Sequence, residues 1–257
     1  MKYLFGDTDL AARRLRLLAR VYKPSTQAFL RNAVETSPGL AIDLGCGPGY
    51  TTQLVAQETQ ARHTVGLDSS PAFVAEANAN AAPNLTFYRH NVRHTPLPAA
   101  PAGLIFARYL LAHLEAPESL ARGWISQLAP GGRLLLEEVE QIETDVRVFT
   151  HYLGIVERML AASGSDLYVG RILAGLCPAG DARLVHNRLR RIPVSNQDAA
   201  KMFSMNIVNW GTNDFIRTNY ATGEIIELEL ALSRIAEGGP ASGTILWKQR
   251  QVAFEKA

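Results

Sequence analysis

Hydrophobic residues fall into two alternating patterns along the chain, short continuous runs and longer stretches with helical spacing. The short runs predict strands over residues 40–44, 63–68, 85–89, 103–107 and 133–138. Between them, apolar residues recur every three to four positions in 51–58 and 117–128, and Ser70 with Pro71 begins another helix. Apolar strands that alternate with helices are typical of a parallel sheet covered on both faces.

The two ends of the chain depart from this alternation. Near the start, the spacing predicts a helix that begins at Thr8 or Asp9 and ends at Pro24, followed by a second helix over 26–34. After residue 140, helical patterns cover 146–162, 168–176, 198–207 and 224–235, with a loop over 210–214 and strands over 182–192 and 244–254. We therefore expect a single domain, 1–257, that consists of a helical N-terminal cap (1–36), a core (37–195), a helical lid insertion (196–240) and a closing strand (241–257).

Composition and charge narrow the classes of function. The 257 residues include 26 Lys and Arg against 24 Asp and Glu, so no strong field attracts nucleic acid or anionic lipid. No apolar stretch approaches the roughly 20 residues that a membrane-spanning helix needs. Cys46 and Cys177 make neither a disulfide framework nor a zinc pattern, and His90 and His94 have no further ligand nearby, so we expect no metal. The expected location is the cytoplasm.

The most informative segment is a glycine loop that directly follows the strand 40–44. Gly45, Gly47 and Gly49 let a ligand approach the backbone, but Tyr50 stands where a dinucleotide-binding loop needs its third glycine. Asp68 ends the next strand, where a carboxylate can accept both hydroxyls of a ribose. The alternatives are that the glycines only make a tight turn and that Asp68 only helps to begin the following helix.

With these motifs in place, the chain resembles the class I S-adenosylmethionine-dependent methyltransferases. The resemblance rests on the glycine loop, Asp68, Asn91, the run 107–109 and the run 128–132. More narrowly, the segments 3–6, 14–15 and 108–114 resemble the small-molecule branch of ubiquinone/menaquinone-type enzymes. The resemblance implies a Rossmann-like α/β fold with a seven-stranded, mostly parallel sheet whose last strand is antiparallel. It also implies S-adenosylmethionine as cofactor and S-adenosylhomocysteine as product.

Carried over residue by residue, the resemblance implies a set of cofactor-binding side chains and backbone groups. Asn91 takes the place of a common aspartate, and its Oδ1 can still accept a hydrogen bond from the adenine amino group. Asn91 could instead only shape its loop. The expected cofactor-binding residues are Tyr3, Gly45, Cys46, Gly47, Gly49, Asp68, Ser69, Asn91, Val92 and Arg108.

Residues for the chemistry and for the acceptor are less sharply indicated. His113 is the best general-base candidate, and Glu138 and Tyr109 lie at the same edge of the sheet. His113 could instead pack under the lid, and Glu138 could be a solvated strand-end charge. Tyr152, Phe203 and Trp210 are expected to line a substrate pocket, with the alternative that they form the core of the helical insertion.

We therefore expect methyl transfer to an oxygen, nitrogen or carbon of a small, apolar or aromatic metabolite, by a monomer or homodimer. One alternative is a protein of the same fold that binds the cofactor without transferring methyl, as a cyclase or a regulator. Another alternative is an RNA or protein methyltransferase, which the lack of a basic module disfavours.

Overall fold

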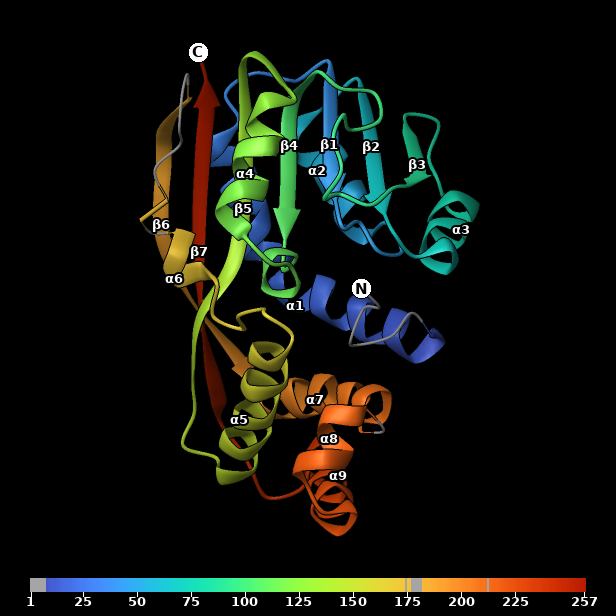
Figure 1. Ribbon diagram of the computed structural model, residues 1–257, viewed down its shortest axis with the longest axis vertical. Helices are drawn as coiled ribbons and strands as arrows, with labels where there is room; N and C mark the ends of the chain where they lie inside the picture. The colour runs from blue at the N-terminus through green and yellow to red at the C-terminus, as the bar shows by residue number, and fades with distance from the viewer. Residues whose placement is uncertain (1–7, 174, 177–181, 212) are drawn as a thin grey trace.

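A computed structural model describes residues 8–173, 175–176, 182–211 and 213–257 of the chain. It contains a seven-stranded sheet with the order β3-β2-β1-β4-β5-β7-β6, which Figure 1 shows with helices on both faces. The strands are β1 (Leu40–Leu44), β2 (His63–Asp68), β3 (Leu85–Arg89), β4 (Ala102–Arg108), β5 (Leu128–Glu143), β6 (Ala182–Ser195) and β7 (Thr244–Lys256). The helices are α1 (Asp9–Ala33), α2 (Tyr50–Thr59), α3 (Pro71–Ala79), η1 (Leu111–His113), α4 (Pro117–Ser126), α5 (Arg147–Ala162), α6 (Gly170–Leu173), α7 (Asn196–Trp210), α8 (Asp214–Asn219) and α9 (Thr222–Ala236).

The topology confirms the predicted fold class. Strands β3, β2, β1, β4 and β5 are parallel, and β7 runs antiparallel to both β5 and β6. Leu44 at the end of β1 is paired with Leu67 of β2 and with Ala107 of β4, so the three strands end at one level. From β1 the sheet continues to β2 and β3 on one side, and to β4 and β5 on the other side. The strand order therefore reverses between β1 and β4, and ligands bind in open α/β sheets at such a topological switch point.

The first helix is longer than the sequence pattern predicts. Pro24 lies inside α1 and does not end it, so the prediction of two separate helices was wrong. Proline costs a helix one hydrogen bond and a steric clash, about 3 kcal/mol. Burial on both sides of the proline offsets that cost, since Tyr22 is 1% exposed and Phe29 is 1% exposed.

Other boundaries differ in ways that follow from packing. The strand expected over 133–138 is the sixteen-residue β5, because β7 pairs with it as far as Glu143. The loop expected over 210–214 is shorter, since α7 continues through the fully buried Trp210 and α8 begins at Asp214. The helix expected over 168–176 is the short α6.

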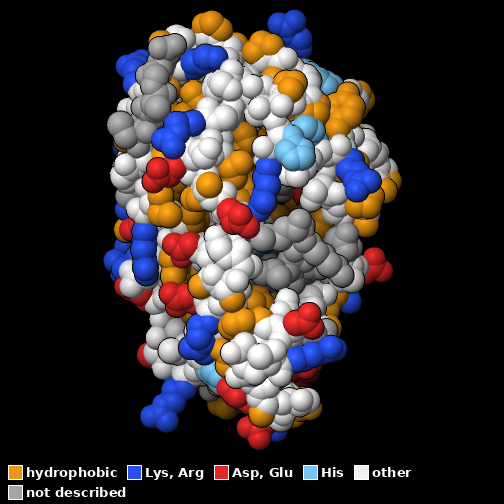
Figure 2. Space-filling model, viewed as in Figure 1, with side chains coloured by type: hydrophobic (Ala, Val, Ile, Leu, Met, Phe, Trp, Pro, Cys, Tyr) orange, Lys and Arg blue, Asp and Glu red, His pale blue; other side chains and the backbone are white. Residues whose placement is uncertain are grey.

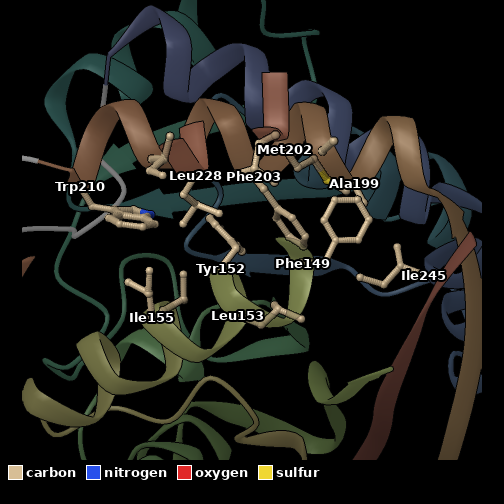
Figure 3. Packing of buried hydrophobic residues seen from close by; sticks show 14 of the residues in the cluster. Phe149, Tyr152, Leu153, Ile155, Ala199, Met202, Phe203, Trp210, Leu228 and Ile245 are labelled. Carbon is tan, nitrogen blue, oxygen red and sulfur yellow. The ribbon is translucent and has the colours of Figure 1, made fainter. Parts of the chain in front are cut away.

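Helices α5, α7, α8 and α9 form a second layer below the sheet in Figure 1, around the lower parts of β5, β6 and β7. Figure 3 shows the centre of this layer, where aromatic side chains from α5 and α7 meet. The rings of Tyr152 and Phe203 stack with centroids 4.1 Å apart, and Trp210 lies 5.8 Å from Tyr152. Each of the three is at most 4% exposed, so they form the core of the insertion.

The surface agrees with the near-neutral charge of the chain. On the face that Figure 2 shows, Lys and Arg side chains are interspersed with Asp and Glu. Within the described residues, no helix is both long enough and apolar enough to cross a membrane.

Replacing Phe203 with Ala tests whether this aromatic cluster is core. We expect Phe203→Ala to lower the free energy of unfolding by about 3–5 kcal/mol, the usual cost of deleting a buried aromatic ring. Urea denaturation measures the change. The matched control is Val208→Ala on the same helix, which is 52% exposed and should change stability by no more than about 0.5 kcal/mol. Equal stability of Phe203→Ala and the wild type would contradict the core assignment.

Candidate functional site

The glycine loop between β1 and α2 has a backbone conformation that residues with a Cβ atom rarely adopt. Gly45 has φ +66°, and a Cβ there would lie 2.8 Å from Cδ1 of Leu110. Gly49 has φ +88°, and a Cβ there would lie 2.9 Å from the ring of Phe87. These left-handed positions favour glycine. The loop therefore turns tightly and keeps its backbone accessible from the cavity described below.

Asp68, at the end of β2, holds this loop from the neighbouring strand. Its Oδ2 accepts a hydrogen bond from the backbone N–H of Gly47 at 2.8 Å, and its Oδ1 accepts one from Ser70 N–H at 2.9 Å. Ser70 in turn begins α3 by accepting from Phe73 N–H. An ionised carboxylate has about four acceptor positions, and Asp68 also borders the cavity described below.

Asp43, one strand position before Leu44, is buried beneath the loop. Its Oδ2 accepts a hydrogen bond from the hydroxyl of Thr52 at 2.7 Å, and it is 1% exposed. Burial raises the pKa of Asp43 to about 7. Asp43 therefore braces the start of α2 against β1 and does not line the cavity.

A cavity of about 830 Å³ opens at the carboxyl ends of the strands, which is a typical size for a small-molecule site. Figure 1 shows α1 lying across these strand ends, between the sheet and the second helical layer. The wall opposite the strand ends is formed by Arg14, Leu15, Leu18 and Ala19 of α1 and by the end of α5. The cavity is thus shared by the N-terminal helix and the core.

A buried chain of hydrogen bonds fixes one wall of the cavity. Arg108 Nη1 donates to Thr26 Oγ1 at 2.9 Å, and the Thr26 hydroxyl donates to Glu137 Oε2 at 2.6 Å. Gln251 Nε2 donates to the other oxygen of Glu137 at 2.6 Å. Burial raises the pKa of Glu137, and the charge of Arg108 opposes that shift. The chain ties α1 to β4, β5 and β7, with Arg108 at its cavity end.

His113 lies in η1 and lines the cavity. Burial lowers its pKa from 6.5 to about 3, and the positive charge of Arg14 lowers it further in the same direction. The ring is therefore neutral at physiological pH. A base with so low a pKa is poorly matched to proton abstraction at neutral pH.

Glu138 is buried and Tyr109 is partly buried, so neither is a fully solvated group at the end of its strand. Glu138 is 0% exposed, and its Oε1 accepts hydrogen bonds from Leu110 N–H and Leu111 N–H, both at 2.8 Å. Burial raises its pKa to about 8. Tyr109 lines the cavity with φ +54°, and its hydroxyl accepts a hydrogen bond from Gln249 Nε2. Burial raises the pKa of Tyr109 well above its usual range.

The loop after β3 forms the far end of the cavity. Asn91 lines it, but its Oδ1 already accepts a hydrogen bond from Arg93 N–H at 3.2 Å, which is the loop-shaping role. The carbonyl of Val92 accepts from the indole of Trp124 at 2.8 Å, which fixes this loop against α4. Asn91 can still face a ligand, because an amide oxygen has two acceptor positions.

The structure brings together most of the residues that the sequence singles out. Those that line the cavity are Gly45, Cys46, Gly47, Asp68, Ser69, Asn91, Val92, Arg108, Tyr109 and His113. Those that do not line it are Gly49, Glu138, Tyr152, Phe203 and Trp210. Tyr3 lies outside the described residues. Tyr152, Phe203 and Trp210 do not line the cavity because they pack against one another in the core of the second helical layer.

The predicted site residues do not include Arg14, a cavity-lining residue that is only 6% exposed, although the segment 14–15 is part of the family resemblance. A signal for it is present in the sequence. Arg14 lies three residues after Ala11 and four before Leu18, on the inward face of α1, whereas Arg13 and Arg16 lie on the exposed face. A charged residue on the apolar stripe of a helix is an exception that calls for a partner or a ligand.

No group of three or more His, Cys, Asp or Glu that could hold a metal ion occurs among the described residues. His90 Nε2 contacts the carbonyl oxygen of His94 at 3.0 Å and so joins the two ends of its loop.

Comparison with known proteins agrees with this geometry. Residues 41–132 match the family described as methyltransferase domain. Trans-aconitate 2-methyltransferase from Methylobacterium radiotolerans is 32% identical over 157 residues, which cover 61% of this chain and 59% of that protein. The chain thus matches about three fifths of the length of this curated relative. The narrower expectation of a ubiquinone/menaquinone-type branch is corrected, because the relative is a trans-aconitate enzyme.

Solved structures share the fold at low sequence identity. Coclaurine N-methyltransferase, bound to N-methylheliamine and S-adenosylhomocysteine, has a TM-score of 0.54 at 17% identity and covers 91% of this chain and 72% of its own. The [4+2]-cyclase SpnF has a TM-score of 0.52 at 17% identity and covers 88% and 80%. The fold therefore serves more than one chemistry, and the function has to be argued from the site.

Because the pKa of Glu138 is raised in the folded protein, we expect the free energy of unfolding to decrease as the pH rises. The folded protein keeps a proton on Glu138 up to about pH 8, whereas the unfolded chain releases it above its ordinary pKa of 4.5. The contribution of Glu138 to the free energy of unfolding is therefore fully present below pH 4.5 and is lost as the pH rises toward 8. The loss is no more than about 1.4 kcal/mol per pH unit.

Glu138→Gln keeps an oxygen acceptor for the two backbone N–H groups and removes the titration. Urea denaturation between about pH 5 and pH 8 should show a shallower loss of stability for the variant than for the wild type. Asp43 titrates in both proteins and so cancels in the comparison. Identical slopes would contradict the buried, protonated state of Glu138.

Proposed function

We propose that the chain is a class I S-adenosylmethionine-dependent methyltransferase that transfers the methyl group to a carboxylate oxygen of a small organic acid. The match of residues 41–132 to the family described as methyltransferase domain supports the transferase activity. The single observation that carries the choice of acceptor is the charge of the cavity. Four arginines line it, Arg14, Arg89, Arg93 and Arg108, and Asp68 is the only acid in its described lining.

The residues present fit the cofactor. The glycine loop leaves backbone accessible where a Cβ would collide with Leu110 or Phe87. Asp68 borders the cavity beside that loop, where its carboxylate would accept hydrogen bonds from ribose hydroxyls, and Asn91 and Val92 border it at the far end. When bound there, S-adenosylmethionine supplies an activated methyl group on its sulfonium.

The protein's own contribution is to hold the acceptor in line with that methyl group and to exclude water. Positioning of two reactants can supply about 7–11 kcal/mol of the barrier to a bimolecular reaction. The wall formed by α1 covers the strand ends and separates the cavity from solvent on that side. The Arg108–Thr26–Glu137 chain keeps this wall in register with the sheet.

The charge of the cavity favours an anionic acceptor. The cofactor carries a sulfonium, an ammonium and one carboxylate, so its net charge is positive and adds to that of the arginines. A cationic acceptor, such as a protonated amine, would be repelled by the arginines in this space. An acceptor carboxylate would instead be attracted, and guanidinium groups match its geometry.

The protonation states of the candidate bases support the same acceptor. His113 is neutral with a pKa of about 3, and Tyr109 holds its proton because burial raises its pKa. Neither group is matched to removing a proton at neutral pH. A carboxylate is already ionised there, since its reference pKa is near 4, and it needs no base. The role proposed for His113 is therefore to line the acceptor space.

The relative's name gives independent support, since trans-aconitate is a carboxylic acid. This replaces the broader expectation of an oxygen, nitrogen or carbon acceptor. A cofactor-binding protein without methyl transfer remains the alternative, because the [4+2]-cyclase SpnF shares the fold.

The product of the reaction distinguishes these functions. Purified protein is incubated with methyl-deuterated S-adenosylmethionine and a panel of small organic acids, and labelled products are identified by mass spectrometry. We expect a labelled methyl ester that alkali hydrolyses. A label that resists alkali, as in an amine or a carbon product, would contradict carboxylate methylation, and the absence of any labelled product would favour the non-transferring alternative.

His113→Gln tests the absence of a general base. We expect the pH dependence of kcat/KM between about pH 6 and pH 8 to be the same in both proteins, because His113, with a pKa of about 3, does not titrate in that range. A loss of about tenfold or less would reflect altered packing. A limb near pH 6.5 that is present in the wild type and absent in His113→Gln would overturn this assignment.

A further inference from the structure

A row of polar side chains crosses three neighbouring strands of the sheet beneath α1. Arg108 of β4 is in register with Glu137 of β5, and Glu137 is in register with Gln251 of β7, so the three lie side by side on one face. Glu137 is 0% exposed and Gln251 is 2% exposed. Arg108, the last residue of β4, is the member of the row that lines the cavity.

Thr26 of α1 joins this row from the helix that covers it. Its hydroxyl has one hydrogen, which it donates to Glu137 Oε2 at 2.6 Å, and its oxygen accepts from Arg108 Nη1 at 2.9 Å. Gln251 Nε2 donates to the other oxygen of Glu137 at 2.6 Å. A guanidinium has five N–H donors, so the bond to Thr26 fixes the orientation of Arg108 and does not exhaust its donors.

Attachment of α1 to the sheet does not by itself require charged groups. Phe29 and Leu30 of α1 are buried against apolar residues of β1, β4 and β5. Burying a carboxylate costs free energy, and apolar side chains of similar volume in its place are often as stable or more stable. What Glu137 and Thr26 add is a fixed orientation of a cation at the wall of the cavity.

The order of the strands places Arg108 on the side of the cavity away from Asn91. Asn91 follows β3, Asp68 ends β2, and β1 with its glycine loop lies between β2 and β4. Ribose hydroxyls at Asp68 and an adenine beside Asn91 therefore leave the side of β1 and β4 to the amino-acid end of the cofactor. That end carries a carboxylate, which a guanidinium can bind with two parallel hydrogen bonds.

We propose that Arg108 binds the carboxylate at the amino-acid end of the cofactor, and that Thr26 and Glu137 are positioning residues that aim its guanidinium at that group. This inference rests on the proposed function, because it takes the cavity to be the site of S-adenosylmethionine. It adds to that function a reason for the buried carboxylate of Glu137 beside the cavity wall.

The experiment compares two ligands that differ only in this carboxylate. S-adenosylhomocysteine and its decarboxylated form are titrated calorimetrically, without any acceptor, into the wild type, Thr26→Val, Thr26→Ser and Arg108→Gln. The matched control is Thr59→Val, because Thr59 is also a buried helical threonine, 4% exposed, whose hydroxyl donates to the carbonyl of Val55, outside the cavity lining.

We expect the wild type to bind S-adenosylhomocysteine at least about tenfold more tightly than the decarboxylated form. Thr26→Val should weaken the binding of S-adenosylhomocysteine by about 3- to 10-fold, and Arg108→Gln by at least about tenfold. Both variants should bind the decarboxylated form as the wild type does, because the group that Arg108 contacts is missing from it. Thr26→Ser keeps the hydroxyl and should restore the preference, and Thr59→Val should behave as the wild type.

The preference for the carboxylate separates positioning from support of the fold. If Thr26→Val and Arg108→Gln weaken the binding of both ligands equally, the chain has a structural role and the proposal is overturned. An unchanged preference in Arg108→Gln would also overturn it, and this partly exposed position gives the answer even where Thr26→Val does not fold.

The same titrations distinguish this proposal from the proposed function. A preference that depends on Arg108 and Thr26, in a protein that forms no methyl ester, would support the carboxylate site while methyl transfer fails. Ester formation by a wild type that binds both ligands equally would support methyl transfer while the role of Arg108 fails.

Discussion

The hydrogen bond between the Asp68 carboxylate and the backbone N–H of Gly47 is the contact on which the site depends. It joins the carboxyl end of β2 to the loop that follows β1, and so fixes the path of a backbone that contains left-handed glycines. The same carboxylate caps the start of α3 through Ser70 N–H. One side chain therefore holds both the loop and the start of the neighbouring helix at the edge of the cavity.

Helix α1 completes the site from outside the sheet. Its second half is anchored where Thr26 bonds to Glu137 and Arg108, while its first half carries Arg14 and Leu18 into the cavity. Because the helix is continuous through Pro24, the anchor and the lining belong to one helix. The long strands β5 and β7 extend past the ends of the other strands and support the second helical layer, from which the end of α5 lines the cavity together with α1.

The fold was largely predictable because its strands are short, apolar and separated by clear turn residues. The wall of the cavity at the glycine loop and Asp68 was predictable for a related reason, since glycines and an acid at strand ends are local signals. The wall where α1, η1 and α5 meet was not, because no local pattern reports which side chains of separate helices face one space. Tyr152, Phe203 and Trp210 illustrate the difficulty: the same apolar spacing suits a pocket and a core, and only packing decides.

Calorimetric titration of S-adenosylhomocysteine into the wild type and into Asp68→Asn most directly tests the assignment of the cavity. We expect the wild type to bind one molecule per chain. Asp68→Asn should bind at least about tenfold more weakly, because the amide loses a charge and one of the two acceptor oxygens that serve the loop and the ligand. Glu118→Gln, an exposed change outside the cavity lining, should leave affinity unchanged. No binding by the wild type, or equal affinity of Asp68→Asn, would contradict the assignment.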